Sequence, residues 1–160
     1  MANLIRKENS LTDPQTIISS SAEETFSLGK KLAVLLDRGS IVALKGPLGA
    51  GKTCFAKGII SGLGVEEAVT SPTYTIISEY RGFRKTKEPV PVYHIDAYRL
   101  NCNEEFIDLG GEEIVFGNGI SIIEWIERIP LFIVPGALLI DMEITKDDER
   151  IIRITTEGKK

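Results

Sequence analysis

The sequence has few of the residues that build zinc sites, and it has no long hydrophobic run. Its 160 residues include two cysteines, Cys54 and Cys102, and one histidine. The cysteines form no C-x-x-C pair, so a thiolate zinc site is not expected. Residues 1–15 lack the apolar core of a signal peptide, and no later apolar run approaches the length of a membrane span. We therefore expect a cytoplasmic protein that makes no contact with a membrane.

An excess of positive charge is also absent. Nineteen Lys and Arg residues stand against 23 Asp and Glu residues, which gives a net charge of −4. A broad basic face that holds nucleic acid by itself is therefore not expected, although a partner could hold it. The chain is 42% hydrophobic and 26% charged, as in ordinary globular proteins. We predict one domain over residues 1–160, in which residues 1–14 form a loose leader.

The clearest motif is the segment 46–53, which matches the phosphate-binding loop G-x-x-x-x-G-K-[ST] at each fixed position. Its residues are Gly46, Pro47, Leu48, Gly49, Ala50, Gly51, Lys52 and Thr53. The apolar run 41–44 predicts a strand before the loop, and residues 54–60 predict a helix after it. In this context Lys52 is expected to reach the β- and γ-phosphates of a nucleotide, and the Thr53 hydroxyl to bind Mg²⁺. A nucleotide site implies a reducing compartment, so free cysteines are expected.

The remaining pattern predicts a three-layer α/β fold with a partly parallel sheet and antiparallel C-terminal strands. Strands are expected at 16–20, 41–44, 75–80, 90–95, 120–123, 137–144 and 150–155. Helices are expected at 25–36, after the loop to about 61–64, and at 103–109, with short turns at 112–116 and 126–129. Ser21 and Glu24 fit a capping box, and residues 81–89 lack periodicity and predict a hairpin loop. The ligand should lie at the carboxyl ends of the parallel strands.

Two acids stand at the ends of apolar strands, where a carboxylate near Mg²⁺ is expected. Asp96 follows the strand at 90–95, and Glu124 follows the strand at 120–123. Either fits this position, and either could instead cap the next helix. The hydroxyl-rich segment 70–75 is either a switch that senses the γ-phosphate or an ordinary polar turn.

Other candidates have a structural alternative. His94, a lone histidine in a strand, is expected to have a structural role, and a catalytic role is the alternative. Trp125 could stack on a base or a partner, or simply pack. Arg99 could neutralise phosphate charge or pair with a surface acid. Cys54, beside the loop, is expected to be a small buried residue.

Four segments together resemble a known family. They are 46–53, 71–75, 93–100 and 124–125, in this order and at this spacing. The chain resembles the TsaE family, the small ATPases of bacterial tRNA threonylcarbamoyladenosine biosynthesis. The resemblance extends from about Ser21 to the C-terminus. The resemblance implies an ATPase that joins the proteins TsaB and TsaD, which modify the adenosine next to the anticodon of tRNA. It further implies that hydrolysis resets this complex, and that tRNA is contacted only through it.

The resemblance also implies residue roles. Thr53 and Glu124 match the Mg²⁺ ligands, and Asp96 matches the acid that positions the attacking water, so Lys52, Asp96 and Glu124 form the catalytic set. ATP or ADP would be bound by Thr25, residues 46–54 and Trp125.

The chain departs from the family at Pro47, where many relatives have Asp, and at Cys54, where they have a second threonine. Proline removes one N–H that could bind phosphate. A pair of glycines, Gly110 and Gly111, also replaces a single glycine.

Two other functions remain open. A small kinase would need an arginine-bearing lid, but the arginines are scattered and only residues 81–89 form a loop long enough for one. A non-enzymatic nucleotide-dependent binding module would not need the two strand-end carboxylates. The lack of an N-K-x-D guanine-reading motif favours ATP over GTP.

Overall fold

The computed structural model describes residues 14–158, so the leader predicted at 1–14 lies outside the described residues except for Pro14. Residues 14–158 form a seven-stranded sheet in the order β1-β7-β6-β2-β5-β4-β3. The strands are β1 (Gln15–Ser19), β2 (Ile41–Lys45), β3 (Ile77–Phe83), β4 (Pro89–Asp96), β5 (Ile120–Glu124), β6 (Leu138–Ile144) and β7 (Arg150–Thr156). β6, β2, β5 and β4 run parallel, while β7 and β1 at one edge and β3 at the other pair antiparallel.

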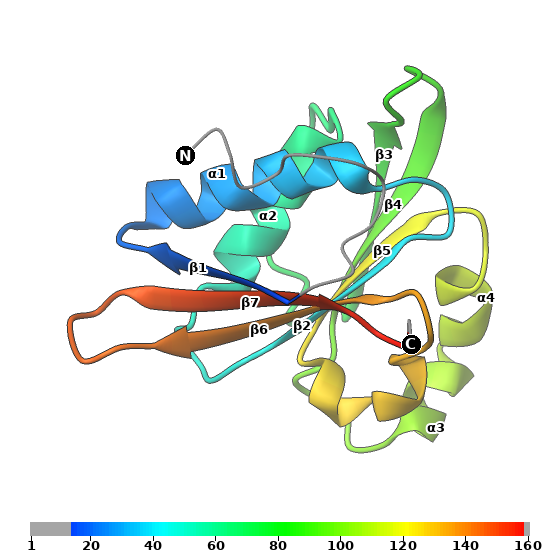
Figure 1. The fold of residues 1–160 in the computed structure, drawn as a ribbon. Helices are drawn as coiled ribbons and strands as arrows, with labels where there is room; N and C mark the ends of the chain where they lie inside the picture. Colours follow the sequence, from blue (N-terminus) through cyan, green and yellow to red (C-terminus); the bar gives the residue numbers. More distant parts are fainter. Residues whose placement is uncertain (1–13, 159–160) are drawn as a thin grey trace.

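Helices cover both faces of this sheet, as predicted (Figure 1). They are α1 (Ala22–Leu32), α2 (Lys52–Gly62), α3 (Asn103–Asp108) and α4 (Gly111–Val115), with the 3₁₀ turns η1 (Ala33–Leu35), η2 (Ile126–Arg128) and η3 (Pro130–Phe132). α1 and α2 pack on one face over a core that includes Phe55 and Ile122, and the short helices pack on the other over Ile123 and Phe132. The partly parallel three-layer α/β fold is therefore confirmed.

Glycines bring α1 and α2 into close contact. A Cβ on Gly29 would lie 2.3 Å from the carbonyl oxygen of Phe55, and one on Gly58 would lie 2.2 Å from that of Phe26. Side chains at these two positions would push the helices apart. Because α2 begins at the phosphate-binding loop, this contact fixes the loop against α1.

The predicted helices are present, but their boundaries differ from the predicted ones. The helix predicted at 25–36 begins at Ala22 and tightens to a 3₁₀ turn at its end. Ser21 caps it by accepting from the N–H of Glu24, while the Glu24 carboxylate accepts from Ser20 and not from Ser21 itself. The Gly110 backbone is left-handed, with φ of 82°, and separates α3 from α4 as expected.

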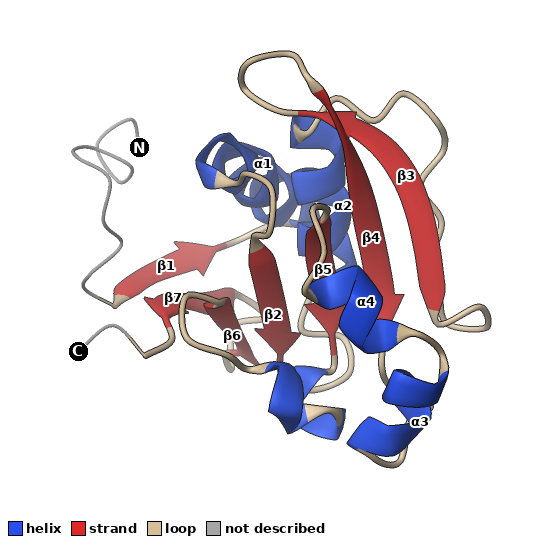
Figure 2. Ribbon diagram, turned by 90° about the vertical axis from the view of Figure 1, so that its right-hand side faces the viewer, coloured by secondary structure: helices blue, strands red, loops and turns tan. Residues whose placement is uncertain are grey.

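The hairpin loop predicted at 81–89 is present, but it is shorter than predicted. β3 continues to Phe83 and pairs with Pro89, so that only residues 84–88 form the turn of a β3–β4 hairpin (Figure 2). Arg84 ties this turn to Asp37 through one ion pair and forms a second ion pair with Glu88 at the other end of the turn. The polar sequence concealed an edge strand, whose outward face needs no apolar residues.

No helix within residues 14–158 is long and apolar enough to cross a membrane.

Candidate nucleotide-binding site

The phosphate-binding loop joins β2 to α2 at the carboxyl end of the parallel strands, where the ligand was predicted (Figure 2). Gly46, Gly49 and Gly51 have φ of 146°, 81° and 97°, a region that side chains with a Cβ rarely adopt. A Cβ on Gly46 would also lie 2.4 Å from the carbonyl oxygen of Met142 in β6. The fixed glycines of the motif are therefore required by the backbone path. Gly51 turns the chain directly into α2, whose first residue is Lys52.

Lys52 is buried and directed back into its own loop. Its Nζ donates to the carbonyl oxygens of Gly46 at 2.6 Å and Pro47 at 2.8 Å. It also lies 4.0 Å from the ring centroid of Trp125. Burial lowers the pKa of Lys52, and the negative charges of Glu127, Glu124 and Asp96 oppose that shift. The ammonium thus sits at the centre of the loop among acceptors, where phosphate oxygens could replace the carbonyls.

Glu124, at the end of β5, connects the loop helix to the sheet. Its Oε1 accepts from the Thr53 hydroxyl at 2.6 Å, and its Oε2 lies 2.6 Å from Nε2 of His94. The Glu124 residue is 1% exposed, and His94 is completely buried. Of the two strand-end acids, Glu124 is therefore the one that contacts the threonine of the loop motif.

Asp96 ends β4 directly beside Glu124 in the sheet register. Its Oδ1 accepts from the N–H of Tyr98 at 3.0 Å, and its Oδ2 accepts from the Thr73 hydroxyl at 3.4 Å. Burial raises the pKa of Asp96, and the charge of Glu124 raises it further, while the two hydrogen bonds oppose the shift. A carboxylate with a raised pKa is a stronger base than an exposed aspartate.

The hydroxyl-rich segment 70–75 is tied to this end of β4. Thr73 bonds to Asp96, and its hydroxyl lies 2.8 Å from that of Ser71. Tyr74 is 83% exposed, and the guanidinium of Arg99 lies 4.5 Å from its ring centroid. Among the described residues Arg99 therefore contacts an aromatic ring instead of the surface acid that was one predicted partner.

Thr25 and Cys54 lie where α1 meets the loop. The methyl carbon of Thr25 is 3.5 Å from the position of a Cβ on Gly51, while its hydroxyl bonds to that of Ser19 at 2.8 Å. Cys54 is half-buried, so the prediction of a buried residue is only partly correct, and its thiol donates to the carbonyl of Ala22. The described cysteines are both free, as expected.

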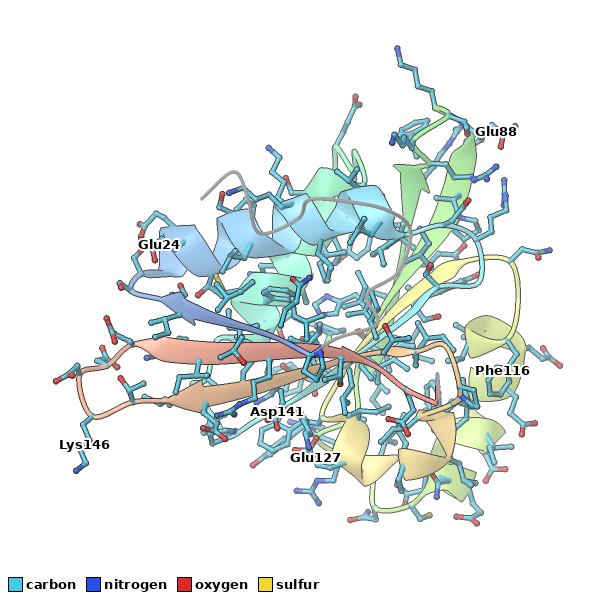
Figure 3. The ribbon with its side chains drawn as sticks, viewed as in Figure 1. Glu24, Glu88, Phe116, Glu127, Asp141 and Lys146 are labelled. Carbon is cyan, nitrogen blue, oxygen red and sulfur yellow. The ribbon has the colours of Figure 1, made fainter. Side chains whose placement is uncertain are left out.

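Trp125 adopts a left-handed backbone with φ of 58°, which a non-glycine residue rarely does. This turn places its ring against Lys52 and 4.9 Å from the ring of Tyr98. Tyr98 had no separate role in the sequence-based predictions, although it lies within the family segment 93–100, and these predictions missed Glu127 of η2 (Figure 3), whose charge acts on Lys52. No motif marks Glu127, which reaches the site only through the path of the chain after β5.

Comparison with known proteins then decides the family. The family model described as "Threonylcarbamoyl adenosine biosynthesis protein TsaE" matches residues 19–153. The chain belongs to the TsaE family. It is 40% identical over 137 residues to the tRNA threonylcarbamoyladenosine biosynthesis protein TsaE of Treponema pallidum, covering 86% of this chain and 97% of that protein. The TsaE protein of Bacillus subtilis is 39% identical over 138 residues, covering 86% and 83%.

A solved structure agrees with this assignment. The crystal structure of Bacillus subtilis YdiB matches with a TM-score of 0.76 and 33% identity, covering 94% of this chain and 90% of that one. The TsaE family takes part in tRNA threonylcarbamoyladenosine biosynthesis, and its fold here is that of the nucleotide-binding P-loop proteins. The family resemblance seen in the sequence is thus confirmed.

Proposed function

We propose that this TsaE-family chain is an Mg²⁺-dependent ATPase that supports formation of the threonylcarbamoyl modification on the adenosine next to the tRNA anticodon. It acts in the cytoplasm in a complex with TsaB and TsaD, and tRNA is contacted through that complex. Hydrolysis of ATP to ADP resets the complex between turnovers. The observation that carries the proposal is the hydrogen bond from Thr53 to Glu124, which joins the loop helix to a strand-end carboxylate.

Thr53 and Glu124 fit an Mg²⁺ site by their chemistry. Both present oxygen atoms, and proteins usually bind Mg²⁺ through one or two carboxylates together with substrate phosphates. Bound there, Mg²⁺ would neutralise charge on the phosphate oxygens. Lys52 would exchange its loop carbonyls for the β- and γ-phosphates, so its positive charge remains paired in both states.

Asp96 is the proposed residue that orients the attacking water. Its burial and raised pKa favour acceptance of a proton or a strong hydrogen bond from water. Thr73 and Tyr98 hold both of its oxygens, so the carboxylate has a fixed direction. The contact with Thr73 would also couple Asp96 to segment 70–75, which supports the interpretation of that segment as a switch.

The departures from the family pattern leave phosphate binding intact in this proposal. Pro47 has no N–H, and its carbonyl accepts from Ala50 at 3.1 Å. The N–H groups of Gly51 and of the first turn of α2, including Cys54, are assigned to the phosphates, because a helix N-terminus favours anions. Thr25 would line the nucleotide from α1, where it lies against Gly51.

The test is ATP turnover by the isolated chain and by the chain mixed with TsaB and TsaD. We expect slow Mg²⁺-dependent hydrolysis alone and faster hydrolysis with the partners, and loss of both in Lys52→Ala. Equal rates with and without partners would contradict the proposed complex. Nucleotide binding without any hydrolysis would instead favour the binding module.

A kinase gains no support from the structure. Both ends of the segment that a lid would require are strand, and its turn at 84–88 is held by ion pairs to Asp37 and within itself. Phosphoryl transfer from ATP to nucleoside monophosphates or sugars would overturn the proposed function in favour of a kinase.

A further inference from the structure

His94 is a buried polar residue to which the proposed chemistry gives no role. It lies on β4 two residues before Asp96, so its side chain points to the same face of the sheet as Asp96. The imidazole is completely buried, and Nδ1 has no hydrogen-bond partner among the described residues. Its one polar contact there is the 2.6 Å hydrogen bond between Nε2 and Oε2 of Glu124. His94 therefore cannot touch a nucleotide, and its influence must pass through Glu124.

The direction of this bond follows from the carboxylate. An ionised Glu124 only accepts, so Nε2 of His94 must carry a hydrogen. In the neutral imidazole, Nδ1 then carries none. This tautomer is also the better one for burial, because it avoids an unpaired N–H in the core. Glu124 is thus held at both oxygens, by Thr53 from the loop helix and by His94 from the neighbouring strand.

The two hydrogen bonds differ in what else each donor has to do. Thr53 is itself a proposed Mg²⁺ ligand, so a lone pair of its hydroxyl would be directed to the metal while its hydrogen stays available to Glu124. His94 faces the other oxygen from behind, within the core, and can keep its bond whether or not nucleotide is bound. We propose that His94 is a positioning residue that orients Glu124 for the Mg²⁺ site. This inference rests on the proposed role of Glu124 as a metal ligand.

Hydrogen-bonded supports of this kind tune metal sites, and their removal costs about 10- to 100-fold in metal affinity. The chain offers a matched pair of variants. In His94→Gln the side-chain amide nitrogen reaches about as far as Nε2, whereas in His94→Asn it stops near Nδ1 and falls short of Glu124. Both variants keep a polar amide at the site, so they differ mainly in whether the bond to Glu124 can form. Ser121→Ala is the control for a change inside the sheet, because its buried hydroxyl has no partner among residues 14–158.

The first measurement is the tautomer, read by ¹⁵N NMR from two-bond couplings in the protein without nucleotide. His94 is the one histidine of the chain, so its ring signals need no assignment. We expect the Nε2–H form. The Nδ1–H form would overturn the proposal, because Nε2 could not then donate to Glu124.

The second measurement is the affinity for Mn²⁺, followed by electron paramagnetic resonance with bound ADP so that no hydrolysis intervenes. We expect His94→Asn to weaken Mn²⁺ binding by about 10- to 100-fold, with metal-free ADP affinity unchanged, and His94→Gln and Ser121→Ala to stay near wild type. In a Glu124→Ala background, His94→Asn should cause no further loss, because its effect acts through Glu124.

Equal Mn²⁺ affinity in wild type and His94→Asn, with a loss in Glu124→Ala, would overturn the positioning role alone. A further loss in the Glu124→Ala background would also overturn it. Unchanged Mn²⁺ affinity in Glu124→Ala would instead overturn the proposed metal ligand, and with it this inference. If His94→Asn does not fold, the comparison of wild type with His94→Gln decides, since a loss in His94→Gln would contradict the proposal and retention would support it.

Discussion

Replacement of Glu124 by Gln and by Ala should separate its electrostatic role from its structural one. In Glu124→Gln, the amide oxygen can accept from Nε2 of His94, and the amide nitrogen can donate to the Thr53 hydroxyl after that hydroxyl rotates. Both hydrogen bonds then survive, so the free energy of unfolding should fall by less than about 1 kcal/mol. The negative charge is lost, however, and Mg²⁺-dependent hydrolysis should fall at least about 100-fold, which corresponds to roughly 3 kcal/mol.

Glu124→Ala should lose both stability and hydrolysis. It leaves the N–H of His94 unpaired in the core, which costs about 1–3 kcal/mol, whereas the half-buried Thr53 can turn to water. At this chain length each kcal/mol lowers the melting temperature by about 2–4 °C. Thermal unfolding without nucleotide and ATP turnover are measured on both variants. Equal melting temperatures for Glu124→Gln and Glu124→Ala, or near-normal ATP hydrolysis by Glu124→Gln, would refute this account of Glu124.

Three further predictions concern other parts of the site. Trp125 is the one tryptophan of the chain, and its ring centroid lies 4.0 Å from Nζ of Lys52, so binding of ADP should change the Trp125 fluorescence by drawing the Lys52 ammonium away. The same fluorescence change in Lys52→Ala would contradict this prediction. The raised pKa of Asp96 means that the folded protein holds this proton more tightly than the unfolded chain, so Asp96 lowers stability as pH rises through the window above 3.8. Without Mg²⁺ or nucleotide, Asp96→Asn should therefore unfold at a higher temperature than wild type at pH 7, and this difference should vanish near pH 3.8. The same variant should lose ATP hydrolysis. A melting temperature below that of wild type at pH 7 would count against the raised pKa. Gly58→Ala should cost about 1–3 kcal/mol in thermal unfolding by pushing α1 from α2, and exposed Ser27→Ala on α1 should cost much less.

The sequence reveals the loop because its chemistry is local. Three glycines with φ of 81° to 146°, a lysine and a threonine lie within eight residues, and each fits either the backbone path or the expected binding of phosphate. Most strands and helices were predictable for the same reason, since hydrophobic periodicity depends only on residues that are close together in the sequence.

The choice between Asp96 and Glu124 could not be made from local pattern, because both follow apolar strands. The order of strands decides it. β5 lies beside β2, so Glu124 reaches Thr53, whereas Asp96 lies one strand further out. Strand order depends on contacts between distant segments, which periodicity does not encode. The partner of His94 and the approach of Trp125 to Lys52 were hidden for the same reason.

The most direct test of the proposed function is the rate of ATP hydrolysis by the purified chain, measured with and without TsaB and TsaD at saturating Mg²⁺. The account predicts slow turnover alone, a clear increase with both partners, and turnover lowered at least about 100-fold in Glu124→Gln under either condition. An isolated chain that hydrolyses ATP at the same rate with and without TsaB and TsaD, or a Glu124→Gln variant as active as wild type, would contradict it.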